Sequence, residues 1–136
     1  MKIALYVAAL CSMVLFNSPV LATCVQGDLT GVWRVYGSGV SSQGYYSWTR
    51  CKVVVENTGA FNTGSSWCKD VLGATAGVQG GSLSVSSACR VSGQINLNGF
   101  ILTTITEAWL NRSKDVIAGV GTSSSNDIGT ITAIKK

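Results

Sequence analysis

Residues 92–110 constrain the fold more than any other part of the chain. Residues 94–97 alternate polar with apolar side chains, Asn98-Gly99 follows, and residues 100–110 form a run of eleven rich in Ile, Leu and Thr. Asn-Gly favours a type I′ turn, because both residues tolerate positive φ and the twist of the turn matches that of paired strands. The pattern predicts a β-hairpin whose long second strand suits the wall of a small barrel or sandwich.

The remainder of the chain after residue 22 also has the pattern of an all-β protein. Short runs of β-branched and aromatic residues alternate with Gly, Ser and Asn clusters, and apolar residues do not recur at helical spacing. Residues 71–81 could hold a short strand or a loop. The other expected strands lie at residues 31–36, 45–56, 60–69, 82–91, 94–97, 100–110, 116–122 and 128–134.

Consecutive hairpins favour a particular topology for these strands. Local pairing costs less loop entropy than a Greek key, so we expect a small antiparallel up-and-down β-barrel of seven or eight strands. A β-sandwich built from the same strands is the alternative. Glycines inside a strand, as at Gly119 and Gly121, indicate the bulges or bends that a small closed barrel needs.

The first 22 residues have the pattern of a signal peptide. Lys2 precedes an apolar run over residues 3–16, and small residues follow before residue 23. The run is too short for a membrane-spanning helix, which needs about 20 apolar residues. We therefore expect a signal peptide at residues 1–22, a single barrel domain at residues 23–136, and a secreted or periplasmic location without a membrane span.

Four of the five cysteines follow the expected signal peptide, at Cys24, Cys51, Cys68 and Cys89. An even number in an exported chain indicates two disulfides, and the sequence leaves all three connectivities open. Cys24 also stands where a lipid-accepting cysteine would lie, so anchoring through a lipid on Cys24 is the alternative location.

Composition excludes several kinds of chemistry. The chain has no histidine, which removes His-based general acid–base catalysis, Ser-His-Asp and Cys-His systems, and imidazole metal sites. No close pair of cysteines indicates a thiolate metal site. Nine of the ten basic residues and all six acidic ones follow residue 22, giving a net charge of +3, which does not indicate nucleic-acid binding. We expect no cofactor and no metal.

One acidic residue has an informative position. Glu107 lies in the middle of an expected strand, whereas Asp28, Glu56, Asp70 and Asp115 lie beside turns or strand ends. Glu107 is either an outward-facing strand residue beside a basic neighbour or a group that binds a ligand or takes part in catalysis.

Aromatic residues are the other candidates for function. Trp33 and Trp109 suit core packing, and together with Tyr36 they also suit the wall of a ligand pocket. In residues 45–48, Tyr45, Tyr46 and Trp48 are so close in sequence that they cannot all face one side of a strand. Some of them should therefore be exposed or at the mouth of a barrel.

Two segments resemble known barrels. Leu29-Thr30-Gly31-Val32-Trp33 resembles the first strand of the calycins, the avidins and lipocalins, in which a G-x-W motif plugs the closed end of the barrel. Trp109-Leu110-Asn111-Arg112-Ser113 is similar to the avidin segment in which a Trp-Leu pair contacts biotin. Val35 stands where avidins carry the asparagine that binds the biotin ureido group. The resemblance therefore implies the barrel rather than a biotin site.

These features predict an exported, non-enzymatic binding protein with a small apolar ligand in the barrel mouth. The candidate ligand-binding residues are Trp33, Tyr36, Tyr46, Trp48, Glu107 and Trp109. A secreted protein-binding module or inhibitor, acting through Gly/Ser loops and exposed aromatics, is the alternative, and a glycosidase-like enzyme using Glu107 is a third. An open apolar interior would favour the ligand binder.

Overall fold

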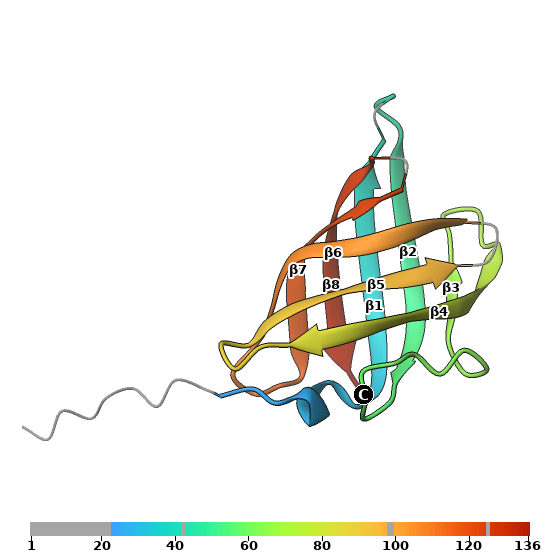
Figure 1. Ribbon diagram of the computed structural model, residues 1–136. Helices are drawn as coiled ribbons and strands as arrows, with labels where there is room; N and C mark the ends of the chain where they lie inside the picture. The colour runs from blue at the N-terminus through green and yellow to red at the C-terminus, as the bar shows by residue number, and fades with distance from the viewer. Residues whose placement is uncertain (1–22, 42, 98–99, 125) are drawn as a thin grey trace, which may run out of the picture.

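The computed structural model describes residues 23–136 except 42, 98–99 and 125. The expected signal peptide and the Asn98-Gly99 turn therefore lie outside the described residues. One short 3₁₀ helix precedes eight strands, as Figure 1 shows. The elements are η1 (Gln26–Leu29), β1 (Gly31–Val40), β2 (Tyr46–Val55), β3 (Trp67–Lys69), β4 (Thr75–Val85), β5 (Arg90–Leu97), β6 (Phe100–Leu110), β7 (Val116–Ser123) and β8 (Ile128–Lys135).

The strands form a closed up-and-down barrel. Each strand pairs antiparallel with the next in sequence, and β8 pairs with β1, where Val35 lies opposite Ala133. The predicted all-β barrel is confirmed, and the sandwich is wrong because closure leaves no second, separate sheet. Within the described part of the chain, no helix is long and apolar enough to cross a membrane.

The hairpin predicted at residues 94–110 is present as β5 and β6, which pair from Leu97 and Phe100 outward. The strand predicted at residues 82–91 is wrong. Residues 86–89 form a turn, in which the Cys89 N–H donates to the Ser86 carbonyl at 2.8 Å. Leu83 and Val85 before the turn and Val91 after it all face the inside of the barrel. The alternation of apolar residues therefore continues across the turn and does not reveal it.

The third predicted strand is also shorter than expected. Only residues 67–69 of the predicted 60–69 belong to β3, while Ala60 and Phe61 form isolated bridges. The undecided residues 71–81 supply the first half of β4. Gly81, in that half, has a φ of 115°, and a Cβ there would lie 2.2 Å from the Gln94 carbonyl oxygen of β5. The close approach of β4 to β5 explains the glycine.

Both disulfides expected from the cysteine count are present. Cys51–Cys68 joins paired positions of β2 and β3, and Cys24–Cys89 joins the segment before η1 to the β4–β5 turn. The Sγ atom of Cys24 is therefore bonded to Cys89, and the same sulfur cannot also carry a lipid.

The end of the barrel near η1 is closed by a cluster around Trp33, which is only 1% exposed. Its indole N–H donates to the Leu29 carbonyl at 2.7 Å, and the Lys135 ammonium lies 5.5 Å from the ring centroid. Lys135 also donates to the Asp28 carbonyl at 2.9 Å. The prediction that Trp33 packs in the core is confirmed, and the Gly31-x-Trp33 motif lies at the closed end.

Candidate functional site

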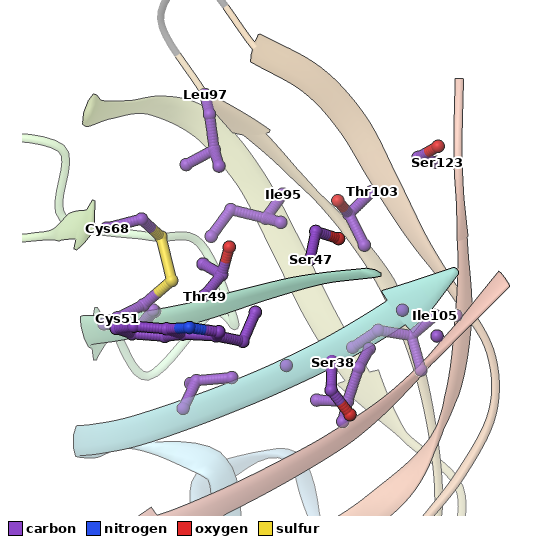
Figure 2. Close-up of a pocket in the computed structure, with 18 of the residues that line it drawn as sticks. Ser38, Ser47, Thr49, Cys51, Cys68, Ile95, Leu97, Thr103, Ile105 and Ser123 are labelled. Carbon is purple, nitrogen blue, oxygen red and sulfur yellow. A yellow bond between two sulfur atoms is a disulfide. The ribbon is translucent and has the colours of Figure 1, made fainter. Parts of the chain in front are cut away.

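The opposite end of the barrel opens into a cavity of about 440 Å³. Its lining extends along β1 from Trp33, at the floor, to Gly39 near the rim. This volume lies within the range of about 300–1,000 Å³ that is usual for small-molecule sites. Figure 2 shows side chains of several strands around the cavity, with the Cys51–Cys68 disulfide in one wall.

The cavity is hollow because glycines occupy inward-facing positions near the mouth. Gly37 and Gly39 of β1, Gly121 of β7 and Gly129 of β8 all line it. At Gly37 a Cβ would approach no heavy atom more closely than the Thr130 carbonyl oxygen, at 3.8 Å. The space beside β1 is therefore empty because Gly37 has no side chain. The backbone does not require glycine at this position.

The deeper walls of the cavity are apolar. Inward-facing side chains of six strands surround the space above Trp33, and Leu97 lies nearer the mouth at the end of β5. The deeper residues are Val35, Val53, Ile95, Ile105, Ile117, Ile131 and Ala133. Hydroxyl groups lie nearer the mouth, on Ser47 and Thr49 of β2, Thr103 of β6 and Ser123 of β7 (Figure 2). A ligand here would meet an apolar interior and, between that interior and the rim, a set of hydroxyl groups.

Of the predicted ligand-binding residues, two contribute to the cavity. Trp33 forms its floor, and Trp48 borders it near the rim with half of its surface exposed. Tyr36 and Tyr46 point to the outer surface, and Tyr46 is 86% exposed. Both alternate along their strands with inward-facing neighbours. The prediction that they form walls of the cavity is therefore wrong.

The predicted exposure of the aromatic run at residues 45–48 is confirmed. Tyr45, Tyr46 and Trp48 are all exposed where β2 begins, at the mouth of the barrel. Leu72, which is 87% exposed, and Ile128 line the same open end. The rim therefore presents apolar side chains to solvent, next to an apolar interior.

Trp109 and Glu107 also lie outside the barrel, because β6 contains a bulge. Ile105 pairs with Gly121 and Glu107 pairs with Val120, so Thr106 is one residue too many for the ladder. Strict alternation from Ile105 would place Glu107 and Trp109 inside. The extra residue reverses the facing and buries Ala108 and Leu110 in their place. Trp109 is 48% exposed, so the expectation that it packs in the core or lines the pocket is wrong.

Glu107 has the position of a surface residue. Its side chain is exposed, and the ion pair found among the described residues joins Lys114 and Asp28 instead. No three metal-ligating side chains gather in the described part of the chain. The outward-facing interpretation of Glu107 therefore fits the structure, although the expected basic partner is not found among the described residues.

The perturbed carboxylate lies at the closed end and not in the cavity. The Lys114 ammonium, 2.7 Å from the Asp28 carboxylate, and the Val25 N–H, 2.8 Å from it, lower the pKa of Asp28 below its ordinary value of 3.8. Both donors stabilise the ionised form. The electrostatic role of Asp28 is to hold η1 against the β6–β7 turn.

The residues that the sequence analysis missed are the inward-facing hydroxyls and Gly37. The buried face of residues 51–55 was recognised from Cys51, Val53 and Val55. Extending the same alternation toward the N-terminus of β2 reaches Thr49 and Ser47. A signal for these two residues was therefore present in the sequence.

Comparison with known proteins supports the fold. No protein-family model matches the chain, and no curated protein matches it. A de novo designed fluorescence-activating β-barrel is similar in structure, with a TM-score of 0.57 and 14% identity over 83% of this chain and 100% of the designed one. A redesigned β-barrel gives a TM-score of 0.55 and 14% identity over 82% and 94%. At this identity the likeness shows the fold alone, a closed antiparallel β-barrel.

Proposed function

We propose that this protein is an exported, non-enzymatic binding protein that holds a small apolar ligand in the mouth of its barrel. The observation that carries the proposal is the cavity of about 440 Å³ above Trp33, open at one end and walled by apolar side chains. Pockets of this size and character are the usual sites of small apolar ligands. The apolar rim at Tyr46, Leu72 and Ile128 would provide a path for such a ligand from its source to the interior.

Export is supported by the disulfides and by the first 22 residues. Disulfides form and persist in oxidising compartments, and this domain has two of them. The pattern of residues 1–22 is that of a secretory signal. A relationship to the calycins is part of the same proposal, supported by Gly31-x-Trp33 at the closed end of the barrel.

A second candidate, binding of a protein partner, is supported by the aromatic outer surface. Tyr36, Tyr46 and Trp48 are exposed on neighbouring strands, and exposed aromatics are common in protein interfaces. Tyr36 and Tyr46 lie outside the cavity, so variants at these two residues can separate the two functions.

The test compares leucine inside and outside the barrel. Gly37→Leu would project into the cavity, whereas Gly77→Leu would project from the exposed side of β4, where a Cβ meets nothing within 4 Å. Binding is measured as the fluorescence enhancement of N-phenyl-1-naphthylamine, an uncharged apolar dye. We expect one site in the wild type and Gly77→Leu, and affinity at least about tenfold lower in Gly37→Leu, which corresponds to about 1.4 kcal/mol.

Circular dichroism of both variants establishes that the barrel is folded. Equal affinity in folded Gly37→Leu and in the wild type would place the dye outside the cavity and contradict the proposed function. In that case the outer aromatic surface becomes the better candidate, and replacing Tyr36 and Tyr46 by serine tests it.

A further inference from the structure

We infer that the ligand of this barrel is a neutral amphiphile, with an apolar body above Trp33 and an uncharged hydrogen-bonding head beside Thr49 and Thr103. The inference rests on the proposed function, because it assumes that the cavity binds a ligand. It adds the chemical class of that ligand, which follows from where the structure puts charge and where it puts hydroxyl groups.

The interior offers no charge to a ligand head. Among the described lining residues, the charged ones are Lys69, Asp70 and Asp127, and all three lie at the ends of strands near the rim. The deeper wall consists of aliphatic residues, Phe61, Trp33 and the Cys51–Cys68 disulfide. An ionised head without a partner in such surroundings would pay a large desolvation cost.

The rim does not supply a counter-ion for an anionic head either. Cys68 faces inward, so Lys69 faces outward, and its ammonium lies 5.8 Å from the centroid of the Trp67 ring. The Asp70 carboxylate accepts hydrogen bonds from the Leu72 and Ala74 N–H groups, both at 2.9 Å. The Asp70 carboxylate places negative charge at the mouth, which would repel a carboxylate or phosphate.

Among the described lining residues, a carboxylate that could pair with a cationic head occurs only in the turns at the rim. The Asp70 carboxylate is already held in the β3–β4 turn by those two N–H groups. The Asp127 N–H donates to the Ser123 hydroxyl at 3.1 Å, which ties residue 127 to the end of β7. Both aspartates therefore belong to turns at the rim and not to the inward-facing rows of the cavity.

Hydroxyl groups, in contrast, are available inside. Thr49 and Thr103 are half-buried and face inward from β2 and β6 (Figure 2), and neither hydroxyl has a hydrogen-bond partner among the described residues. Ser47 continues the row of Thr49 toward the mouth. A hydroxyl can donate and accept, so this set suits a neutral alcohol, ester or amide. A site with half-buried hydroxyls also discriminates against a ligand that leaves them unpaired.

The experiment compares three probes that differ only in the head. 1-Decanol, decanoate and decylammonium compete with N-phenyl-1-naphthylamine at pH 7.5 for the wild-type barrel. We expect decanol to bind at least about tenfold more tightly than either ion, a difference of about 1.4 kcal/mol. Decanoate or decylammonium binding as tightly as decanol would overturn the inference and leave the proposed function intact.

The position of the head is tested with shape-conserving variants. Thr49→Val and Thr103→Val should each weaken decanol binding about 2- to 10-fold, the range for one hydrogen bond of about 0.5–1.5 kcal/mol. Thr132→Val, on the exposed side of β8, is the matched control and should change nothing. Unchanged decanol affinity in both inner variants would overturn the placement of the head.

If the dye binds in the cavity and none of the three probes displaces it, the inference alone is overturned. A failure of the proposed function gives a different result. If the dye binds equally well to the wild type and to folded Gly37→Leu, the cavity is not the site. The inference then falls together with the proposed function.

Discussion

Trp33 connects η1 and the start of β1 to the last strand of the barrel. Its indole binds the Leu29 carbonyl of η1, and its ring lies under the ammonium of Lys135 in the last strand. Lys135 in turn binds the carbonyl of Asp28. The closed end of the barrel is therefore held by a few polar contacts around one buried ring, and its stability should respond to single substitutions.

Replacing Trp33 by phenylalanine tests the indole hydrogen bond. An aromatic ring is kept, but it is smaller, and the Leu29 carbonyl loses its donor in a fully buried position, which together should lower the free energy of unfolding by at least about 1–3 kcal/mol. The same replacement at Trp109, which is half-exposed, should change it by less than about 0.5 kcal/mol. Urea unfolding followed by circular dichroism measures both, and similar losses at the two positions would contradict the assignment.

Asp28 should make stability depend on pH. Because its pKa is lowered in the folded state, its contribution is complete above the ordinary Asp value of 3.8 and is lost as the pH falls through the folded pKa. The difference in unfolding free energy between the wild type and Asp28→Asn should therefore be largest near neutral pH and shrink toward pH 2. Urea titrations at several pH values measure it. A difference that grows on acidification would contradict the ion pair with Lys114.

For single strands, the sequence predicted which strands pair better than it predicted which side chains point into the barrel. The hairpin of β5 and β6 could be predicted because Asn98-Gly99 and the alternation at residues 94–97 are local signals. The outward position of Trp109 could not, because the bulge at Thr106 depends on how β6 pairs with β7. The prediction of one strand at residues 82–91 is wrong because the pattern of inward-facing residues continues across a turn.

The candidate site also combines features that could be predicted from the sequence with features that could not. Trp33 was found because it follows a local motif at the start of β1. A ligand in the barrel mouth was predicted, but the sequence did not show whether the interior is open, since the cavity arises where Gly37, Gly121 and Gly129, on three strands, come together after closure. Tyr36 and Tyr46 were placed in the wall from their chemistry, although strand alternation puts them on the outer surface.

The bulge makes a direct prediction about β6. Trp109→Lys should be tolerated with a cost of no more than about 1 kcal/mol, because the side chain is already half in solvent. Ala108→Lys, one residue earlier, would bury an unpaired charge at a position with no exposure and should cost more than about 3 kcal/mol or prevent folding. Thermal and urea unfolding give the comparison, and the reverse order would show that Trp109 faces inward.

For the whole molecule, the two disulfides have different roles. Cys24–Cys89 spans 65 residues and fixes the segment before η1 to the β4–β5 turn, far from the mouth. Cys51–Cys68 spans 17 residues and forms part of the cavity wall. The longer loop restricts the unfolded chain more, whereas the shorter one borders the ligand site.

Removing each disulfide by a pair of Cys→Ala substitutions should separate these roles. From loop length, the loss of Cys24–Cys89 should cost about 4 kcal/mol and the loss of Cys51–Cys68 about 3 kcal/mol. The order should reverse for binding, with dye affinity reduced by the loss of Cys51–Cys68 and unchanged by that of Cys24–Cys89. Urea unfolding and dye titration on the same samples measure both. Lower dye affinity in a folded variant without Cys24–Cys89 would contradict the separation.

The empty position at Gly37 has a consequence for how such a protein could change its specificity. The strand is paired on both sides at this residue, and a Cβ there would come no closer to a heavy atom than 3.8 Å, an ordinary van der Waals contact. Alanine, valine and leucine at this position would therefore progressively reduce the length of the longest ligand that fits, without disturbing the hydrogen bonds of the barrel wall. The size of the ligand that a barrel of this kind accepts could therefore change through one codon, while its fold stays the same.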